Sequence, residues 1–126
     1  MRKMIADTKA KGAVPIVFSL TVRNIWNEGR VERGSGKYGQ WAAEIAKSHN
    51  VQFIDLTRII ADRYEELGQE KVLALFASDH THTNPAGAEL NAELVVAGLK
   101  TLKHNPIGRY FSAKGKAVKP QRGTNE

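Results

Sequence analysis

Residues 13–20 read AVPIVFSL, and this stretch decides the fold class. The run is apolar and rich in branched side chains, without the alternation of a strand that has one face in water. Continuous runs of this kind are typical of strands covered on both faces, as in parallel sheets. Residues 51–56, VQFIDL, form a second such run. The sequence therefore predicts two parallel strands between layers of helix.

Helical patterns surround the two strands. Apolar residues recur at helical spacing over residues 2–11, 40–49 and 57–67, and again after Asn84-Pro85. Gly12 and Asn50 stand where residues in a left-handed conformation end helices, and Thr57 is placed to cap the helix that follows it. Residues 21–39 hold four glycines and clustered charges, which indicates a long loop. The order of elements is that of an α/β layer protein.

Two parallel strands are too few for a stable sheet. Doubly wound α/β sheets have about five strands. We therefore expect that strands completing the sheet are missing from this chain, and that it represents the C-terminal portion of a larger domain.

Composition narrows the function classes. The 126 residues suffice for one domain, and the formal net charge is +6. Residues 1–99 hold 12 basic and 12 acidic residues, so the excess lies in the seven bases and one acid that follow. We expect one folded body over residues 1–104 and a flexible basic tail over 105–126, solvated rather than bound to nucleic acid. No apolar run suggests a membrane span, and the absence of cysteine excludes disulfides and thiolate chemistry.

Residues 78–88, SDHTHTNPAGA, concentrate groups that transfer protons. Asp79, His80 and His82 have three interpretations. They are surface residues beside a helix cap, or metal ligands, or the acid and base of a catalytic triad. A metal site needs further ligands, and neither His49 nor His104 is placed by the sequence to join one. In a triad, Asp79 would accept a hydrogen bond from His82 Nδ1, while Nε2 would take a proton from a serine.

DHTHTNPAGAELNA, residues 79–92, resembles the last conserved block of the SGNH (GDSL-like) hydrolases, in their rhamnogalacturonan acetylesterase-like branch. KGAVPIVFSLTVRNIW, YGQWAAEIA, VQFIDL and EKVLALF are similar to consecutive segments of that branch, so the resemblance covers residues 1–113. It implies a flavodoxin-like three-layer α/β/α fold and a serine esterase that removes acetyl groups from pectic polysaccharide, without metal or other cofactor. Asp79 would be the triad acid, His82 the base, and His80 a residue that shapes the loop or contacts substrate.

The chain departs from this family in one respect. Family members carry their nucleophile in an N-terminal Gly-Asp-Ser block and complete the oxyanion hole from two later blocks, and none of these blocks is present. The serines, at positions 19, 35, 48, 78 and 112, all lie in other contexts. We expect a structural role for Ser19. The chain alone should then be inactive, and the alternative is a noncatalytic carbohydrate-binding or interaction fragment. A secreted or periplasmic location is expected by family, although residues 1–7 show no signal peptide.

The loop after the first strand should open at the rim where α/β folds bind ligands. There Trp26 could stack on a sugar ring and Arg23 could pair with a uronate carboxylate, with Asn24 and His80 as further substrate contacts. The alternative, which we favour for Arg23 and Trp26, is a surface ion pair and packing beneath the loop. Trp41, on a helix face, is predicted to lie in the core.

Overall fold

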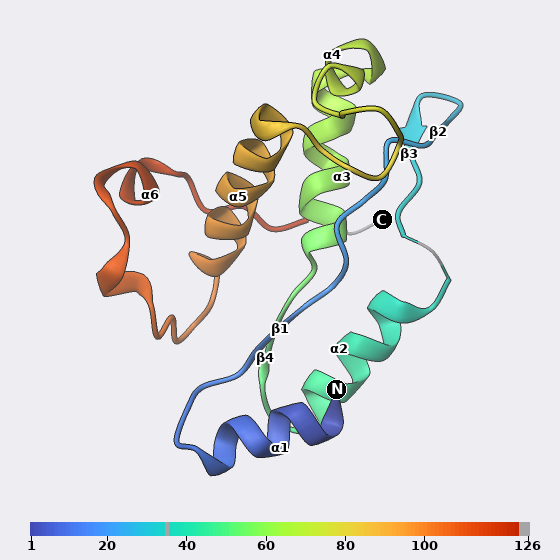
Figure 1. The fold of residues 1–126 in the computed structure, drawn as a ribbon. Coiled ribbons are helices and arrows are strands. Elements are labelled where there is room, and N and C mark those ends of the chain that lie inside the picture. The colour runs from blue at the N-terminus through green and yellow to red at the C-terminus, as the bar shows by residue number, and fades with distance from the viewer. Residues whose placement is uncertain (35, 124–126) are drawn as a thin grey trace.

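The computed structural model describes residues 1–34 and 36–123, which form helices around a small parallel sheet (Figure 1). The elements in chain order are α1 (Arg2–Ala10), β1 (Ile16–Phe18), β2 (Trp26–Asn27), β3 (Arg30–Val31), α2 (Tyr38–Ser48), β4 (Gln52–Ile54), α3 (Leu56–Leu67), α4 (Gln69–Leu73), α5 (Pro85–Leu99), the 3-10 helix η1 (Gly108–Tyr110) and α6 (Ala113–Ala117).

The two predicted strands pair in parallel. Ile16 lies opposite Gln52 and Phe18 opposite Ile54, and the Ser19 N–H continues the ladder to the Ile54 carbonyl at 3.0 Å. Both strands are shorter than the apolar runs that predicted them. Helix α2 connects them and packs against both, which is the arrangement of a parallel crossover.

The sheet lies between two helical layers (Figure 1). On one face, Ile5 of α1 and the alanines Ala42 and Ala46 of α2 are buried against Val17 of β1. On the other face a larger cluster joins β4 to α3 and α5, with Tyr64, Ile60 and Val72 among its fully buried side chains. Burial on both faces explains why the strand sequences are apolar without alternation.

One edge of the sheet is open. Among the described residues β1 pairs with β4 alone. In a parallel ladder alternate residues bond to alternate sides, so the backbone groups of Ile16 and Phe18 point to the edge away from β4. Val14 and Leu20, on either side of β1, are 61% and 49% exposed.

The helix ends follow the predicted signals with one exception. Gly12 and Asn50 have positive φ angles of 72° and 49°, and Asn84 caps α5 by accepting a hydrogen bond from Gly87 N–H. The prediction that Thr57 caps α3 is wrong. Asp55 is the N-cap and accepts from Arg58 N–H, while the Thr57 hydroxyl donates to the Leu20 carbonyl from inside the helix.

The predicted long loop contains a short hairpin, β2–β3, that is fixed to α3. Arg33 donates to Asp62 at 2.7 Å and to Glu65 at 3.0 Å, and Glu65 also accepts the Val31 N–H at 3.0 Å. Burial disfavours the charged guanidinium, but the two carboxylates outweigh it and raise the pKa of Arg33. The hairpin is therefore held by partly buried ion pairs.

The described part of the basic segment, residues 105–123, contacts α5. Lys114 of α6 pairs with Glu89 and Glu93, Lys100 Nζ donates to the Lys116 and Val118 carbonyls, and Gln121 N–H donates to Ala97. Its flexibility and its separation from the body at residue 104 stay predictions. No helix formed by the described residues has the length and apolar character needed to cross a membrane.

Candidate active site

The sequence DHTHT lies in a loop, residues 77–83, between α4 and α5. A bridge between Phe76 and Thr83 closes its base, and the Ala77 N–H donates to the His82 carbonyl at 2.9 Å. Asn84 anchors the exit of the loop, because its Nδ2 donates to the Ala74 carbonyl at 2.8 Å while its Oδ1 caps α5. The loop is thus built directly onto the first turn of α5.

Asp79 and His82 are brought together in this loop. Asp79 Oδ2 lies 2.7 Å from His82 Nδ1, and Asp79 Oδ1 accepts the backbone N–H groups of Thr81 at 2.6 Å and His82 at 2.7 Å. The carboxylate therefore shapes the loop with one oxygen and orients the imidazole with the other. In this arrangement His82 Nε2 is left to act on another group.

The pair lies at the surface. The side chains of His82 and Asp79 are 76% and 42% exposed. Hydrogen bonds from the imidazole and backbone of His82 and from the Thr81 backbone hold the pKa of Asp79 well below its ordinary value. Asp79 is thus an ionised acceptor across the neutral pH range, as an orienting carboxylate must be.

No serine hydroxyl forms a hydrogen bond with His82 in residues 1–34 and 36–123. Ser19 is buried, and its Oγ donates to Asp55 at 2.8 Å and accepts the Thr57 N–H at 2.9 Å. These bonds join the ends of β1 and β4, which is the structural role expected from the sequence. Ser35 lies outside the described residues.

Of the predicted substrate contacts, Arg23 lies beside this loop and His80 lies in it. Arg23 is exposed and lines a cavity of about 220 Å³ together with Thr81. His80 is exposed as well, and its carbonyl accepts the Asn24 N–H at 2.8 Å. The loop after β1 and the Asp79–His82 loop therefore meet, as expected for two segments at one rim of the sheet.

The two tryptophans differ from each other in their surroundings. Trp26 packs against the core cluster, and its indole N–H donates to Asn24 Oδ1 at 2.7 Å. The prediction that Trp41 lies in the core is wrong, because its side chain is 50% exposed and meets Tyr38 edge to face, with ring centroids 5.5 Å apart. Ala42 and Ala46 occupy the inward face of α2 instead.

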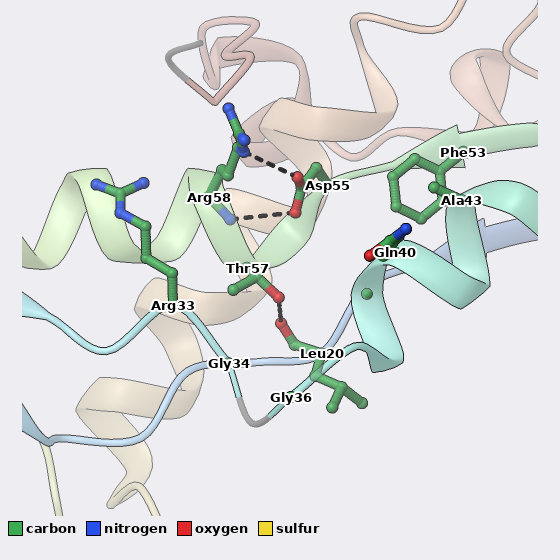
Figure 2. A pocket seen from close by; sticks show the side chains of 11 residues that line it. Leu20, Arg33, Gly34, Gly36, Gln40, Ala43, Phe53, Asp55, Thr57 and Arg58 are labelled. Atoms are coloured by element: carbon green, nitrogen blue, oxygen red, sulfur yellow. Dashed lines mark hydrogen bonds and ion pairs between the residues drawn. The ribbon is translucent and has the colours of Figure 1, made fainter. Parts of the chain in front are cut away.

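A further cavity of about 340 Å³ opens at the carboxyl ends of β1 and β4 (Figure 2). Asp55, which sequence reasoning missed as a polar site residue, lies in it and pairs with Arg58 at 3.2 Å. Figure 2 also shows Leu20 and Gln40 at this cavity, on the strand end and on α2. The signal for Asp55 was its position directly after a buried strand, where polar residues of α/β sites gather.

Metal ligation was the second interpretation of the DHTHT sequence. Within the described ranges, no three His, Cys, Asp or Glu side chains come together in a group that could hold a metal ion. Asp79 Oδ2 and His82 Nδ1 are bonded to each other.

No family model matches the chain. The curated relatives agree with one another, because all three are named as known or probable rhamnogalacturonan acetylesterases. A rhamnogalacturonan acetylesterase of Emericella nidulans is 30% identical over 83 residues, 66% of this chain and 34% of that protein. Two Bacillus subtilis proteins are each 31% identical: the probable rhamnogalacturonan acetylesterase YesY over 107 residues and the rhamnogalacturonan acetylesterase RhgT over 115. These matches cover 81% and 79% of this chain, and 49% and 50% of the relatives. The chain thus spans about half the length of the curated relatives, or less.

A solved structure agrees with this relationship. The crystal structure of the YxiM protein of Bacillus subtilis superposes with a TM-score of 0.73 at 32% sequence identity, over 79% of this chain and 29% of that one. This likeness and the parallel strands flanked by helices confirm the predicted partial α/β/α fold. The chain is therefore a relative of the rhamnogalacturonan acetylesterases, within the SGNH hydrolase relationship that its DHTHT block predicted.

Proposed function

We propose that this chain supplies the acid–base half of a serine esterase that removes O-acetyl groups from a pectic polysaccharide or a related carbohydrate. The hydrogen bond between Asp79 Oδ2 and His82 Nδ1, at 2.7 Å, is the observation that carries the proposal. The names of the relatives support the substrate class. No cofactor enters the proposed reaction.

In the proposed mechanism His82 acts first as base and then as acid. Its Nε2 takes the proton of a serine hydroxyl as the serine oxygen attacks the acetyl carbonyl carbon. The same nitrogen returns that proton to the departing sugar oxygen, which leaves an acetyl-serine intermediate. A water molecule then gives a proton to Nε2 as its oxygen attacks the acetyl carbon, and Nε2 returns that proton to the serine oxygen as acetate leaves. Asp79 holds the imidazole in the required tautomer and stabilises its charged form throughout.

The nucleophile is proposed to come from a segment outside the 126 residues. Three observations support this: the absence of a Gly-Asp-Ser block, the lack of a serine partner for His82 in the described residues, and the coverage of about half of each Bacillus subtilis relative. An acid and a base without a nucleophile and an oxyanion hole lose most of the catalytic effect. The chain alone should then release acetate slowly or not at all.

Exposed polar groups near His82 are the proposed substrate contacts. Arg23 lines the cavity beside Thr81 and carries the guanidinium that would recognise a uronate carboxylate. His80 is exposed on the same loop as His82. Asn24 and Trp26 remain candidates for substrate contact, although the Asn24 side chain and the indole N–H are already bonded to each other.

A chimera tests this function. The portion of YesY that this chain matches is replaced by the chain, and acetate release from acetylated rhamnogalacturonan is measured. We expect hydrolysis that His82→Ala lowers about 10⁴-fold or more, and Asp79→Asn by a similar or smaller factor. His104→Ala is the matched control, because within the described part of the chain this exposed histidine is hydrogen-bonded through its backbone alone, to Gln52.

Two results would contradict the proposal. A folded, active chimera that keeps its rate with His82→Ala removes the acid–base role. Rapid acetate release by the 126-residue chain alone, lost with His82→Ala, places the nucleophile inside the chain.

One observation favours the noncatalytic alternative. Tyr38 and Trp41 present two half-exposed rings on the first turn of α2, and aromatic faces stack on sugar rings. Binding of acetylated rhamnogalacturonan oligosaccharides without acetate release, weakened by Trp41→Ala, would support a carbohydrate-binding function. Tyr110→Ala, at an exposed aromatic residue of η1, is the control for loss of an exposed ring.

A further inference from the structure

The loop of residues 77–83 is shaped by its own hydrogen bonds. Asp79 Oδ1 accepts two N–H groups of the loop, and the Ala77 N–H donates to the His82 carbonyl. Residues 77–82 are all exposed. Internal bonds of this kind fix the local turn but not its direction relative to the sheet, and exposed loops have few contacts to supply that direction. The orientation of His82 therefore depends on what holds the loop from outside.

Asn24 makes the contact that fixes the loop from outside. Its backbone N–H donates to the His80 carbonyl at 2.8 Å. Over the described ranges this is the one hydrogen bond between residues 77–82 and another part of the chain. His80 lies between Asp79 and His82 along the loop, so the bond acts on the segment that carries both members of the pair.

Trp26 holds Asn24 in turn. The indole Nε1–H donates to Asn24 Oδ1 at 2.7 Å, in a partly buried position, and the indole ring packs against the core cluster. A tryptophan has two side-chain torsions, and packing against the core restricts both. The Asn24 side chain is therefore fixed to a rigid group.

Trp26 is itself fixed to α3. It pairs with Val31 in the β2–β3 hairpin, and the Val31 N–H donates to Glu65 Oε1 at 3.0 Å. Arg33, two residues further along, bonds to Asp62 and Glu65. A continuous chain of contacts thus runs from α3 through the hairpin to the His80 carbonyl.

We infer that Trp26 is a positioning residue for the Asp79–His82 pair. Its indole N–H fixes Asn24, and the Asn24 backbone N–H holds the loop so that the imidazole keeps its direction. This role adds a positioning residue to the proposed function. It rests on that function only for the chemistry of Asp79 and His82, because the positioning itself is a property of the 126-residue chain.

Trp26→Phe is the test, because it keeps an aromatic ring in the core and removes the indole N–H. In ¹⁵N-labelled protein, we expect hydrogen exchange of the Asn24 amide to accelerate about fivefold to tenfold, which corresponds to the loss of one hydrogen bond's contribution. The backbone shifts of residues 79–82 and the ring ¹⁵N shifts of His82, which report its tautomer, should also change. Trp41→Phe, at the half-exposed tryptophan, should leave all of these signals at their wild-type values.

Substitutions at Asn24 keep the inference falsifiable if Trp26→Phe disturbs the core. Asn24→Ala removes the acceptor but keeps the backbone N–H, so it should reproduce the Trp26→Phe effect. Asn24→Asp keeps an oxygen for the indole N–H and should restore the wild-type signals. The double variant Trp26→Phe/Asn24→Ala should show no larger effect than either single one.

Wild-type exchange and loop shifts in Asn24→Ala or in a folded Trp26→Phe protein would overturn the inference. A chimera that fails to release acetate would count against the esterase proposal alone, because the exchange and shift measurements need no activity.

Discussion

Gly87 lies in the first turn of α5, where this helix packs closely against the backbone of the segment that precedes the candidate site. A Cβ added at Gly87 would lie 2.2 Å from the Leu75 carbonyl oxygen and 3.0 Å from Thr83 Cβ. The Leu75 oxygen cannot swing away freely, since it also accepts the Asn84 N–H at 3.0 Å. Gly87→Ala must therefore move backbone, either of α5 or of the segment before the loop.

The size of the effect follows from two opposing contributions. Forcing a methyl group into a packed site costs about 1–3 kcal/mol, and a backbone obstacle favours the upper end of that range. Alanine recovers up to about 1 kcal/mol of helix propensity over glycine. We expect a net loss of about 2 kcal/mol in the free energy of unfolding. With a urea m-value of about 1.5 kcal/mol/M, the midpoint falls by about 1 M.

Urea unfolding followed by circular dichroism measures this change, and Gly39→Ala is the matched control. Gly39 also lies in the first turn of a helix, α2, but its added Cβ would meet only Ser19 Cβ at 3.7 Å, an ordinary contact. That variant should be as stable as the wild type or slightly more stable. If Gly87→Ala is also as stable as the wild type, the reasoning about the Leu75 carbonyl is refuted.

Three further perturbations have defined outcomes. Arg33→Met removes the guanidinium that pairs with both Asp62 and Glu65, so it should lower the free energy of unfolding in urea by about 2 kcal/mol, less than the loss of a fully buried pair. A loss below about 0.5 kcal/mol would contradict the role of these ion pairs in fixing the hairpin to α3. The pKa of Asp79 is lowered in the folded chain, so its contribution to stability is present above about pH 4 and is lost as pH falls through the folded value; its ¹³Cγ shift should titrate below about pH 3.9, and a midpoint at or above that value opposes this account. Tyr64→Phe removes the bond to Asn91 Oδ1 at 3.0 Å and should cost about 1 kcal/mol, whereas an unchanged urea midpoint would show that this buried hydroxyl contributes nothing.

The sequence predicted the elements that have a long apolar run or that begin with residues typical of helix ends. The two apolar runs gave the parallel strands, and Asn84-Pro85 gave the start of α5, because a cap and a proline act through their immediate neighbours. The distance between Asp79 and His82 was also predictable, since both lie in one loop of few residues. Local chemistry was sufficient in each case.

Features that depend on distant contacts were missed. Strands β2 and β3 have two residues each, too few for any alternation, and they are held by Arg33 through carboxylates about 30 residues further along the chain. Trp41 looked like a core residue because it is large and apolar, but Ala42 and Ala46 are the α2 residues buried against the sheet, with Ile45 partly buried beside them. The bond between Asn24 and His80 joins segments with no shared sequence signal.

The open edge of β1 has a consequence for how this chain behaves at high concentration. Unpaired backbone groups beside apolar side chains are a template for association with other chains, and the 61% exposed Val14 and 49% exposed Leu20 border this edge. One feature limits such growth. The strand has only three residues, so only the backbone groups of Ile16 and Phe18 face the open edge. Association at high concentration is therefore restrained by the shortness of one strand.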